Sequence, residues 1–587
     1  MTDQKNMILA IVLSVLILLG FQFFVERPKY EAQRAQQAQE QAQQAESAAA
    51  GGTAPAPGQQ STVPNAPGVP GSTATQAVGE SREAALALTP RVKIDTPSIK
   101  GSIALKGGRI DDVVLTKYRV DLDPKSPPIH LLDPTGQQRP YYAEFGWVAP
   151  SGSTVALPTP TTLWAADSEI LTPKQPVTLS WSNGQGLTFK RVVSIDDDYM
   201  FTVRQSVVNE TGDPVTLYPY GLISRGGTPH TLGYYILHEG PLGVFDDKLT
   251  EFKYKDLMED GDVEQAATGG WIGITDKYWL AALVPGQSQS WNYSFRYSKA
   301  NQDDRYQVDY LGDATSIAAG AETTVESRLF AGAKEVKLLD RYEEQYGIAN
   351  FDLAIDFGWF YFLTKPYFYA LTWLHAMLGN FGLAILALTV CVKLLFFPLA
   401  NKSYKSMAKM KELTPRLQEM REKYGDDRQR LNEEMMALYK REKVNPAAGC
   451  LPIVVQIPVF FALYKTLFVS IEMRHAPFYG WIKDLSAPDP TTLFNLFGMI
   501  PWDPPQFLMI GAWPVMMGLT MFLQQKLNPA PTDPVQAKVF MFLPIMFTFL
   551  LGHFAAGLVI YWTWNNLLSI TQQAVIMRRM GIRRALS

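Results

Sequence analysis

Hydrophobic and polar positions divide the chain into stretches of different character, and the first of these is apolar. Residues Met7 to Val25 carry only Ser14 and Gln22 as polar side chains. At 1.5 Å per residue the run spans roughly 28 Å, close to the ~30 Å hydrocarbon core of a bilayer. A cleaved signal peptide is the alternative, but phenylalanines occupy the place of a cleavage site. We therefore predict an uncleaved anchor over residues 1–25.

The next stretch, residues 26–90, has no apolar periodicity. It is rich in Gln and Ala and then in Gly, Pro, Ser and Thr. A segment of this composition cannot bury enough apolar surface to offset its chain entropy. The sequence therefore predicts a disordered tether.

Residues 91–345 show the pattern of strands. Short runs in which apolar and polar residues alternate are separated by Asn-Gly and Gly-Gly turns, as in PVTLSWSNGQGLTFKRVVSID. No helix-length period of 3.6 residues interrupts them until the end of the region. We expect a large antiparallel β-sandwich that forms one outer domain.

The last third of the chain carries five further apolar runs. The predicted spans are 381–400, 448–470, 506–526, 537–552 and 555–575. If the last two runs formed one helix, it would be roughly 48 Å long, too long for one crossing without severe tilt. We predict two helices joined by a tight turn and, with the N-terminal anchor, six spans in all.

The linker 346–380 precedes the first of these runs and includes an aromatic, nearly uncharged stretch. Pro366 suits a first helical position, and Gly379-Asn380 marks a break before the next helix. Such a helix is expected to lie in the plane of the membrane interface. An extension of the following span is the alternative, and the Gly-Asn break argues against it.

Residues 401–447 form a strongly charged segment between two spans. Two helical stretches are separated by Gly425, Asp426 and Asp427, where Gly suits a helix end and Asp suits the next N-cap. Met410 and Met436 belong to a Met-bearing face that suits varied apolar partners. We predict a cytoplasmic helical hairpin with Gly425 and Asp426 at its tip. The alternative is a solvated loop that only fixes topology.

The distribution of Lys and Arg predicts the orientation of the spans. Twelve of them lie in 401–447 and four lie in the tail 576–587, whereas the loop 471–505 has two. Basic loops stay in the cytoplasm. The two termini, the hairpin and the loop 527–536 are therefore placed in the cytoplasm, and the β-domain and the loop 471–505 in the periplasm.

Composition narrows the classes of function. Charged residues are 19% of the chain, below the roughly 25% of soluble domains, and the net charge of −3 gives no global reason to bind nucleic acid. Two cysteines in apolar runs and six single histidines form no metal-ligand pattern, and no GxxxxGK[ST] motif occurs. We predict no cofactor, no metal and no enzymatic activity.

Polar side chains within the apolar runs are the candidates for a functional site. Lys393 lies in LALTVCVKLLFFPL, with Thr389 one turn earlier on the same face. The Lys393 cation either snorkels to the cytoplasmic boundary or enters a hydrated pocket, and Thr389 favours the pocket. Gln456 and Asn565 lie in other runs. Single polar residues in spans usually join helices, but together these predict a wet groove that opens to the cytoplasm.

Several of these segments resemble a known family. The runs GDDRQRLNEEMMALYKREKVNPAAGCLPIVVQIPVFFALYKTLF, NPAPTDPVQAKVFMFLPIMFTFLL and AAGLVIYWTWNNLLSITQQ resemble the YidC/Oxa/Alb family of membrane protein insertases, in the Gram-negative form with a large periplasmic domain. The resemblance covers the whole chain in order. It implies a polytopic α-helical membrane protein with a five-helix insertase core and a periplasmic all-β domain of the sugar-mutarotase supersandwich type.

The resemblance also implies a function and a site. Family members insert inner-membrane proteins and help them to fold, alone or with the Sec translocon, through a hydrophilic groove open to cytoplasm and lipid. Lys393 matches the basic residue of that groove, and Thr389, Gln456 and Tyr561 match other groove positions. Trp562 stands where a second Tyr is familiar. The implied partners are nascent membrane proteins, the Sec translocon, the ribosome and the phospholipid bilayer, with a monomer as the functional unit.

Two other functions are weighed against this one. A solute transporter would show repeats and ionisable residues near the midplane, and we find no clear repeat and no paired carboxylates in any span. A membrane-anchored carbohydrate enzyme would need a carboxylate or His constellation within 91–345. The sequence leaves this second possibility open.

Overall fold

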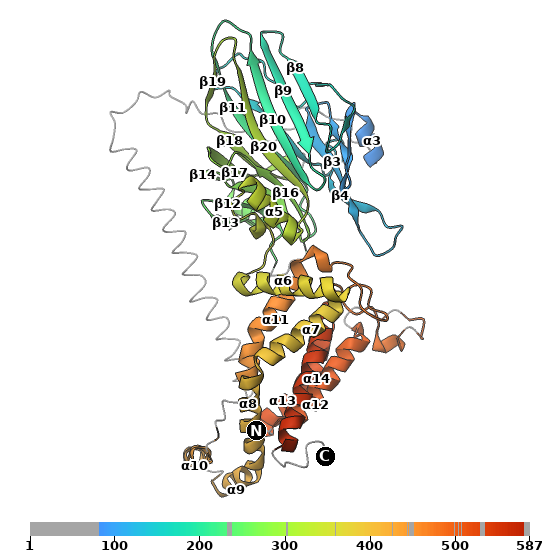
Figure 1. Cartoon of the computed structure of the whole chain (residues 1–587), viewed down its shortest axis with the longest axis vertical. Coiled ribbons are helices and arrows are strands. Elements are labelled where there is room, and N and C mark those ends of the chain that lie inside the picture. Colours follow the sequence, from blue (N-terminus) through green and yellow to red (C-terminus); the bar gives the residue numbers. More distant parts are fainter. Residues whose placement is uncertain are drawn as a thin grey trace, which may run out of the picture.

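The computed structural model of the chain consists of a β-rich part and a helical part, one above the other in Figure 1. It describes residues 81–579 except 232–236, 301–302, 359, 425–426, 443, 445–450, 498, 503, 506–507 and 529–533. The predicted anchor 1–25, nearly all of the tether 26–90 and the end of the tail 576–587 lie outside the described residues.

The β-rich part is a sandwich of two large sheets, as the alternating pattern predicts. The strands of the eleven-stranded sheet are β14 (Val263–Thr268), β17 (Ser290–Ala300), β18 (Asp303–Gly312), β11 (Val215–Gly226), β5 (Tyr141–Val148), β3 (Arg109–Arg119), β2 (Ile99–Ala104), β1 (Arg91–Asp95) and β7 (Ile170–Leu171), with β19 (Thr315–Ile317) on β11 and β4 (Pro128–Leu132) on β3. Those of the nine-stranded sheet are β13 (Lys248–Glu251), β12 (Gly240–Phe245), β15 (Trp271–Thr275), β16 (Trp279–Val284), β20 (Glu322–Ala333), β10 (Met200–Asn209), β9 (Leu187–Ile195), β8 (Val177–Ser182) and β6 (Ala165–Ala166). The pairing of β1 with β7 is parallel and the other pairings are antiparallel.

The period of two is visible in the burial of single strands. Along β9, every second residue from Leu187 to Ile195 is buried, and Phe189 and Val193 join the core between the sheets. On β15 all residues are buried, and Trp271 packs edge-on against Phe351 of the segment that follows the last strand. The apolar alternation of the sequence therefore sets the register of the sheets.

Two short helices in and beside the β-rich part contradict the sequence analysis. Helix α4 (Tyr254–Asp260) interrupts the strands, and α3 (Arg82–Ala87) lies in the predicted tether. The Ser81 hydroxyl caps α3 by accepting from the amide of Ala84, and the Arg82 guanidinium pairs with Asp112 and Asp133. This last turn of the tether is ordered because its charges have partners on the sheet.

The helical part begins after the last strand, and the residues described there form ten further α-helices. They are α5 (Val336–Tyr346), α6 (Tyr361–Leu378), α7 (Phe381–Leu395), α8 (Phe397–Glu412), α9 (Thr414–Tyr424), α10 (Arg428–Arg441), α11 (Leu451–Val469), α12 (Ala512–Leu527), α13 (Pro534–Leu551) and α14 (Ala556–Arg579), with the 3-10 turns η2 (Phe351–Ala354), η4 (Ile471–Met473) and η5 (Leu493–Asn495). The two apolar runs near the C-terminus form two helices, α13 and α14. Within the described residues no single helix is both long and apolar enough to cross a bilayer, but the bent pair of α6 and α7 meets both conditions together.

Helix α6 lies across the top of the helical part, and α7 turns away from it by 120° (Figure 1). Gly379 ends α6 with a φ of 69°, and the Asn380 side chain caps α7 by accepting from the amide of Leu383 at 3.1 Å. The predicted break at this point is confirmed. The predicted start is wrong: α6 begins at Tyr361, so Pro366 lies inside the helix instead of at its first position.

The cytoplasmic hairpin predicted over 401–447 has three helices instead of two. The first predicted stretch is divided between α8 and α9 at Thr414-Pro415, where Pro415 cannot donate an amide to the preceding turn. Asp427 caps α10 as predicted, because its carboxylate accepts from the amide of Arg430 at 3.0 Å. Gly425 and Asp426, the predicted tip, lie outside the described residues.

Charged side chains join the segment that directly follows the last strand to the helices below it. Lys365 on α6 pairs with Asp340 of α5 at 2.9 Å and with Asp352 of η2. Lys465 on α11 pairs with Asp356 at 2.8 Å. Each of these contacts connects an element that follows the last strand with a helix of the lower part, so the two parts meet through a fixed junction.

Glu472 is a further acid at this junction. Its Oε1 accepts from the amide of Val336, the first residue of α5, at 2.9 Å, while Oε2 has no partner among the described residues. Burial, assisted by the nearby Glu335 carboxylate, raises the pKa of Glu472 to about 7. The folded protein therefore holds a proton on Glu472 at pH values where the unfolded chain has lost it.

We expect Glu472→Gln to change how stability depends on pH. In the parent protein, the free energy of unfolding should fall as pH rises from about 4.5 to about 7, because ionised Glu472 is costly in the folded state. The variant should match the parent near pH 4.5 and exceed it by about 2–3 kcal/mol at pH 8. Thermal unfolding of the full chain at both pH values measures this, and an equal difference at both would contradict the prediction.

Candidate functional site

Lys393 lies in the last turn of α7 and points toward α14. Its Nζ donates to the Ser569 hydroxyl at 2.7 Å, and that hydroxyl donates to the backbone carbonyl of Asn565 at 2.8 Å. Among the residues that the structure describes, no carboxylate is paired with Lys393. The position at a helix C-terminus favours a cation, because the last carbonyls of α7 carry partial negative charge.

A cavity of about 50 Å³ lies beside this contact. Its polar lining is Thr389, Lys393, Tyr404, Gln456, Tyr561 and Asn565, and the rest is apolar. A volume of this size holds a few water molecules, and polar partners for them are present. The side chains come from the consecutive helices α7 and α8 and from α11 and α14, which lie further along the chain.

Four of the predicted groove residues line this cavity together with Lys393. Thr389 is buried, and its hydroxyl donates to the carbonyl of Ile385 in its own helix at 2.6 Å. The Gln456 amide is hydrogen-bonded to the Tyr561 hydroxyl across α11 and α14. Asn565 is buried one turn after Tyr561.

Trp562 does not line the cavity. Its ring packs on Phe460 with 4.4 Å between ring centroids and joins an apolar cluster around Met517. Adjacent residues on a helix point about 100° apart, so Tyr561 and Trp562 cannot serve the same cavity equally well. The predicted groove role of Trp562 is replaced by a packing role.

Two residues of the site are absent from the sequence analysis. Ser569 receives the Lys393 ammonium, and Tyr404 lines the cavity from α8. Tyr561, Asn565 and Ser569 follow one another at spacings of four, which is one face of a helix. That spacing is the signal by which Ser569 could have been found.

The methionines of the hairpin are arranged differently from the prediction. Met410 packs, with Met420 and Met435, around a small core of Leu417, Leu438 and Tyr439. Met436 is 51% exposed. The predicted adaptable face therefore includes Met436, whereas Met410 mainly holds α9 and α10 together.

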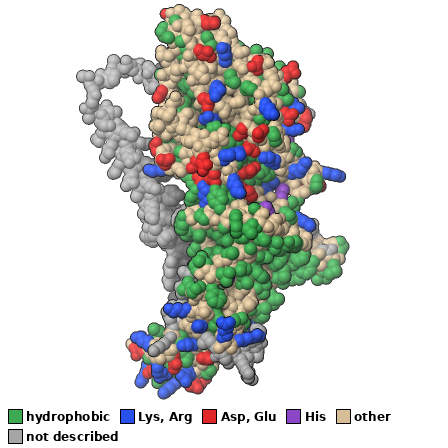
Figure 2. Space-filling model, in the orientation of Figure 1, with side chains coloured by type: hydrophobic (Ala, Val, Ile, Leu, Met, Phe, Trp, Pro, Cys, Tyr) green, Lys and Arg blue, Asp and Glu red, His purple; other side chains and the backbone are tan. Residues whose placement is uncertain are grey.

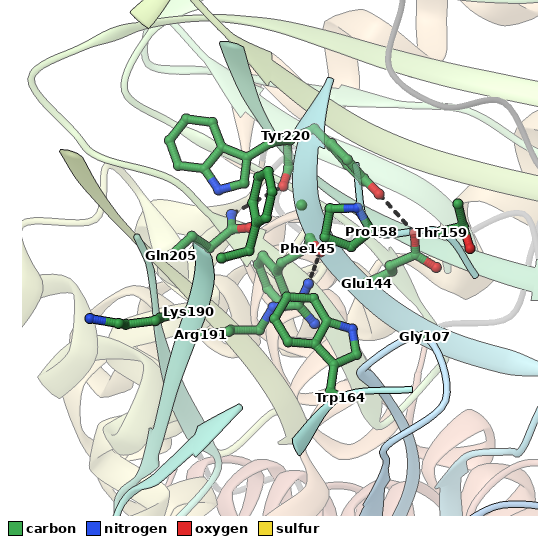
Figure 3. A pocket seen from close by; sticks show the side chains of 13 residues that line it. Gly107, Glu144, Phe145, Pro158, Thr159, Trp164, Lys190, Arg191, Gln205 and Tyr220 are labelled. Carbon is green, nitrogen blue, oxygen red and sulfur yellow. Dashed lines mark hydrogen bonds between the residues drawn. The ribbon is translucent and has the colours of Figure 1, made fainter. Parts of the chain in front are cut away.

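The β-rich part contains a small polar cavity (Figure 3). Glu144 accepts from Arg109 Nε at 2.6 Å and from the Tyr220 hydroxyl at 2.8 Å, and Arg191 donates to the carbonyls of Gly108 and Phe145. The volume is about 20 Å³, enough for about one water molecule and too small for a sugar. These charges hold the sandwich together and are not free to act on a substrate.

Comparison with known proteins agrees with the division of the chain into two parts. The family described as YidC periplasmic domain matches residues 91–370, and the family described as 60Kd inner membrane protein matches residues 373–583. The membrane protein insertase YidC of Methylobacterium radiotolerans is 53% identical, with 99% of this chain and 96% of the relative covered. The YidC of Bradyrhizobium diazoefficiens is 52% identical, with 99% and 97% covered.

The chain belongs to the YidC family of membrane protein insertases. Its function is therefore membrane protein insertion in the inner membrane, with a periplasmic β-rich domain, and the family is not one of enzymes. A solved structure of an active YidC insertase with its first transmembrane domain resolved is 17% identical, with a TM-score of 0.36 over 82% of this chain and 92% of that chain.

The surface of the chain has the charge pattern of a membrane protein. Figure 2 shows a band of hydrophobic side chains around the helices and Lys and Arg gathered at the lower end, over α8 to α10. Large apolar side chains of α13 are exposed, among them Phe540, Met541, Phe542 and Ile545. A continuous exposed apolar surface of this kind needs lipid or protein to cover it.

Proposed function

We propose that the cavity beside Lys393 receives the polar tail of a substrate before its apolar segment enters lipid. The observation that carries this proposal is the Lys393 ammonium, half-buried and bonded to a hydroxyl instead of a carboxylate. Such a cation attracts acidic side chains of an incoming tail. Cavity water and polar side chains lower the cost of bringing the tail part-way into the bilayer.

The apolar segment of the substrate then leaves sideways into lipid. Ile457 and Phe461 on α11 and Leu394 at the end of α7 are exposed, so the walls around the cavity are apolar toward the bilayer. Transfer of an apolar segment into lipid stabilises it by roughly 25 cal/mol per Å² of buried surface. This term drives insertion without a nucleotide.

The topology that we propose has six spans, formed by residues 1–25, 381–400, 448–470, 506–526, 537–552 and 555–575. The distribution of Lys and Arg supports it, since the basic segment 401–447 and the tail 576–587 then lie in the cytoplasm. Helix α6 lies in the plane of the outer interface, with Phe362, Trp373 and Met377 exposed to lipid.

The partners that we propose are the ribosome, the Sec translocon and anionic lipid, with the monomer as the functional unit. Helices α8 to α10 carry exposed Lys and Arg side chains at the lower end of the molecule (Figure 2). These can bind ribosomal RNA or lipid headgroups. The apolar Met436 beside them can bind an emerging apolar segment.

Reconstitution of this chain alone with a short-tailed membrane protein tests the proposed mechanism. Vesicles that contain only this protein should render the substrate tail resistant to external protease. Vesicles without it should leave the tail exposed. If every short-tailed substrate were protected only after the Sec translocon is added, the proposal that the groove acts without the translocon would be contradicted.

The order in which a nascent chain meets the protein gives a separate prediction. A photo-crosslinker at Met436 should capture nascent chains at shorter lengths than one at Gln456, because Met436 is exposed at the hairpin and Gln456 lies inside the cavity. Met435 is the matched control, because it is adjacent to Met436 in the sequence but its side chain packs inside the hairpin. If nascent chains were captured first at Gln456 and never at Met436, the hairpin would be a loop that only sets the topology.

A further inference from the structure

The loop between α11 and α12 presents an apolar surface that no function described so far uses. Residues 490–502, PTTLFNLFGMIPW, contain no charged side chain. Their large side chains are between 37% and 78% exposed: Leu493, Phe494, Leu496, Phe497, Met499, Ile500 and Trp502. In Figure 1 this loop leaves the helical part sideways, near the upper ends of α12 and α14. We call residues 490–502 the apolar loop.

The backbone of the apolar loop satisfies its own hydrogen bonds. The amides of Leu496, Phe497, Met499 and Ile500 donate to the carbonyls of Leu493, Thr492, Leu496 and Asn495, and the amide of Leu493 donates to Ile510. The amide of Phe494 donates to the Thr492 hydroxyl at 3.3 Å. Irregular loops are excluded from an apolar phase because their backbone groups lack hydrogen-bond partners. The backbone amides named above have such partners, so the cost of moving them into an apolar phase is reduced.

The loop is also held in one orientation. The Asp489 carboxylate accepts from the Trp481 indole at 3.1 Å, from the Thr491 hydroxyl at 2.7 Å and from the amide of Trp513 at 2.9 Å. The Thr491 hydroxyl accepts from the amide of Ala512, the first residue of α12, at 3.0 Å. The base of the loop is therefore fixed to the N-terminus of a proposed span.

Two backbone positions in the loop are unusual for apolar residues. Leu496 and Phe497 have φ angles of 50° and 59°, in the left-handed region that bulky residues rarely adopt. The amides of both residues donate within the loop, to the carbonyls of Leu493 and Thr492, while both side chains stay exposed. The turn therefore presents two large apolar side chains outward.

We propose that the apolar loop enters the boundary between headgroups and acyl chains of the outer leaflet and is covered there by phospholipid. The absence of charge over thirteen residues fits lipid, and aromatic side chains such as Trp502 favour that depth. Together with α6, the loop gives the protein two contacts with one leaflet, one attached to α7 and the other to α12. This inference rests on the proposed topology, which places residues 471–505 outside.

Fluorescence quenching in vesicles tests the proposal. The full chain with Cys391→Ser and Cys450→Ser carries one added cysteine, Met499→Cys, labelled with a nitrobenzoxadiazole probe. It is reconstituted into vesicles of phosphatidylcholine and phosphatidylglycerol, with nitroxide on an acyl chain or with iodide in the water. We expect the acyl-chain nitroxide to quench the Met499→Cys probe several-fold more than iodide does.

Two further labelled variants separate the possible failures. Gln185→Cys, on an exposed turn of the β-domain, should be quenched by iodide, and Met541→Cys, exposed on α13, by nitroxide. If Met541→Cys responds to nitroxide but Met499→Cys responds to iodide, the loop proposal is overturned while the topology stands. If neither responds to nitroxide, the topology itself fails. Protection of Met499→Cys from both quenchers would mean that protein covers the loop, which also overturns the proposal.

Discussion

Replacing Lys393 by alanine is expected to lower insertion of substrates with acidic translocated tails by about ten- to a hundredfold. An ionic hydrogen bond contributes about 1.5–3 kcal/mol, and each 1.4 kcal/mol corresponds to a factor of ten. The Lys393 ammonium has no carboxylate partner among the described residues, so its charge is available to a substrate. Insertion of substrates with neutral tails should change much less. Protease protection of the tail in reconstituted vesicles measures both.

Matched variants separate the charge from the shape of the side chain. Lys393→Met keeps the length without the charge and should behave like the alanine variant, whereas Lys393→Arg should retain most of the activity. Lys405→Ala removes an exposed cation of the neighbouring helix and serves as the control. Equal insertion of acidic and neutral tails by Lys393→Ala would contradict the electrostatic mechanism.

The second large effect is expected in the β-rich domain, from Glu144→Ala. This change leaves the Arg109 guanidinium buried without its carboxylate, and the Tyr220 hydroxyl without its acceptor. Removing one partner of a buried ion pair typically lowers the free energy of unfolding by about 3–5 kcal/mol. Denaturant unfolding of the full chain, followed by tryptophan fluorescence, measures the loss.

An exposed pair in the same domain provides the comparison. Arg204 pairs with Glu326 at 2.7 Å across β10 and β20, and its side chain is 60% exposed. Arg204→Ala, which removes the exposed partner, should cost less than about 1 kcal/mol. The double change Arg109→Met with Glu144→Leu should recover most of the loss, since apolar replacement of a buried pair is often neutral. A double variant as unstable as Glu144→Ala would show that packing around the pair matters more than charge.

The sequence predicts which residues line the cavity better than it predicts the residues with which they form hydrogen bonds. Thr389 and Lys393 share a helical face, and this local period was enough to place both at one cavity. The contact of Lys393 with Ser569 joins residues 176 positions apart, so it depends on how α7 and α14 pack. The sequence analysis placed Trp562 in the groove, whereas the structure brings Tyr561 and not Trp562 to the cavity. The rotation of α14 about its own axis decides which of these two neighbours faces the cavity.

The hairpin shows a different limit of sequence reasoning. Its charges and its N-cap at Asp427 are local features and were predicted. The exposure of its methionines depends on how α9 packs on α10, and only the structure separates partly buried Met410 from exposed Met436. Likewise, α3 is ordered by carboxylates of Asp112 and Asp133 that lie far along the chain.

The corner at Gly379 and Asn380 has a mechanical consequence. Helix α6 lies crosswise to α7 and is bound to α5 and η2 through the ion pairs of Lys365. These contacts resist a movement of α7 along its own axis. A displacement of α7 would therefore have to bend the chain at Gly379 or break the contacts of Lys365 with Asp340 and Asp352.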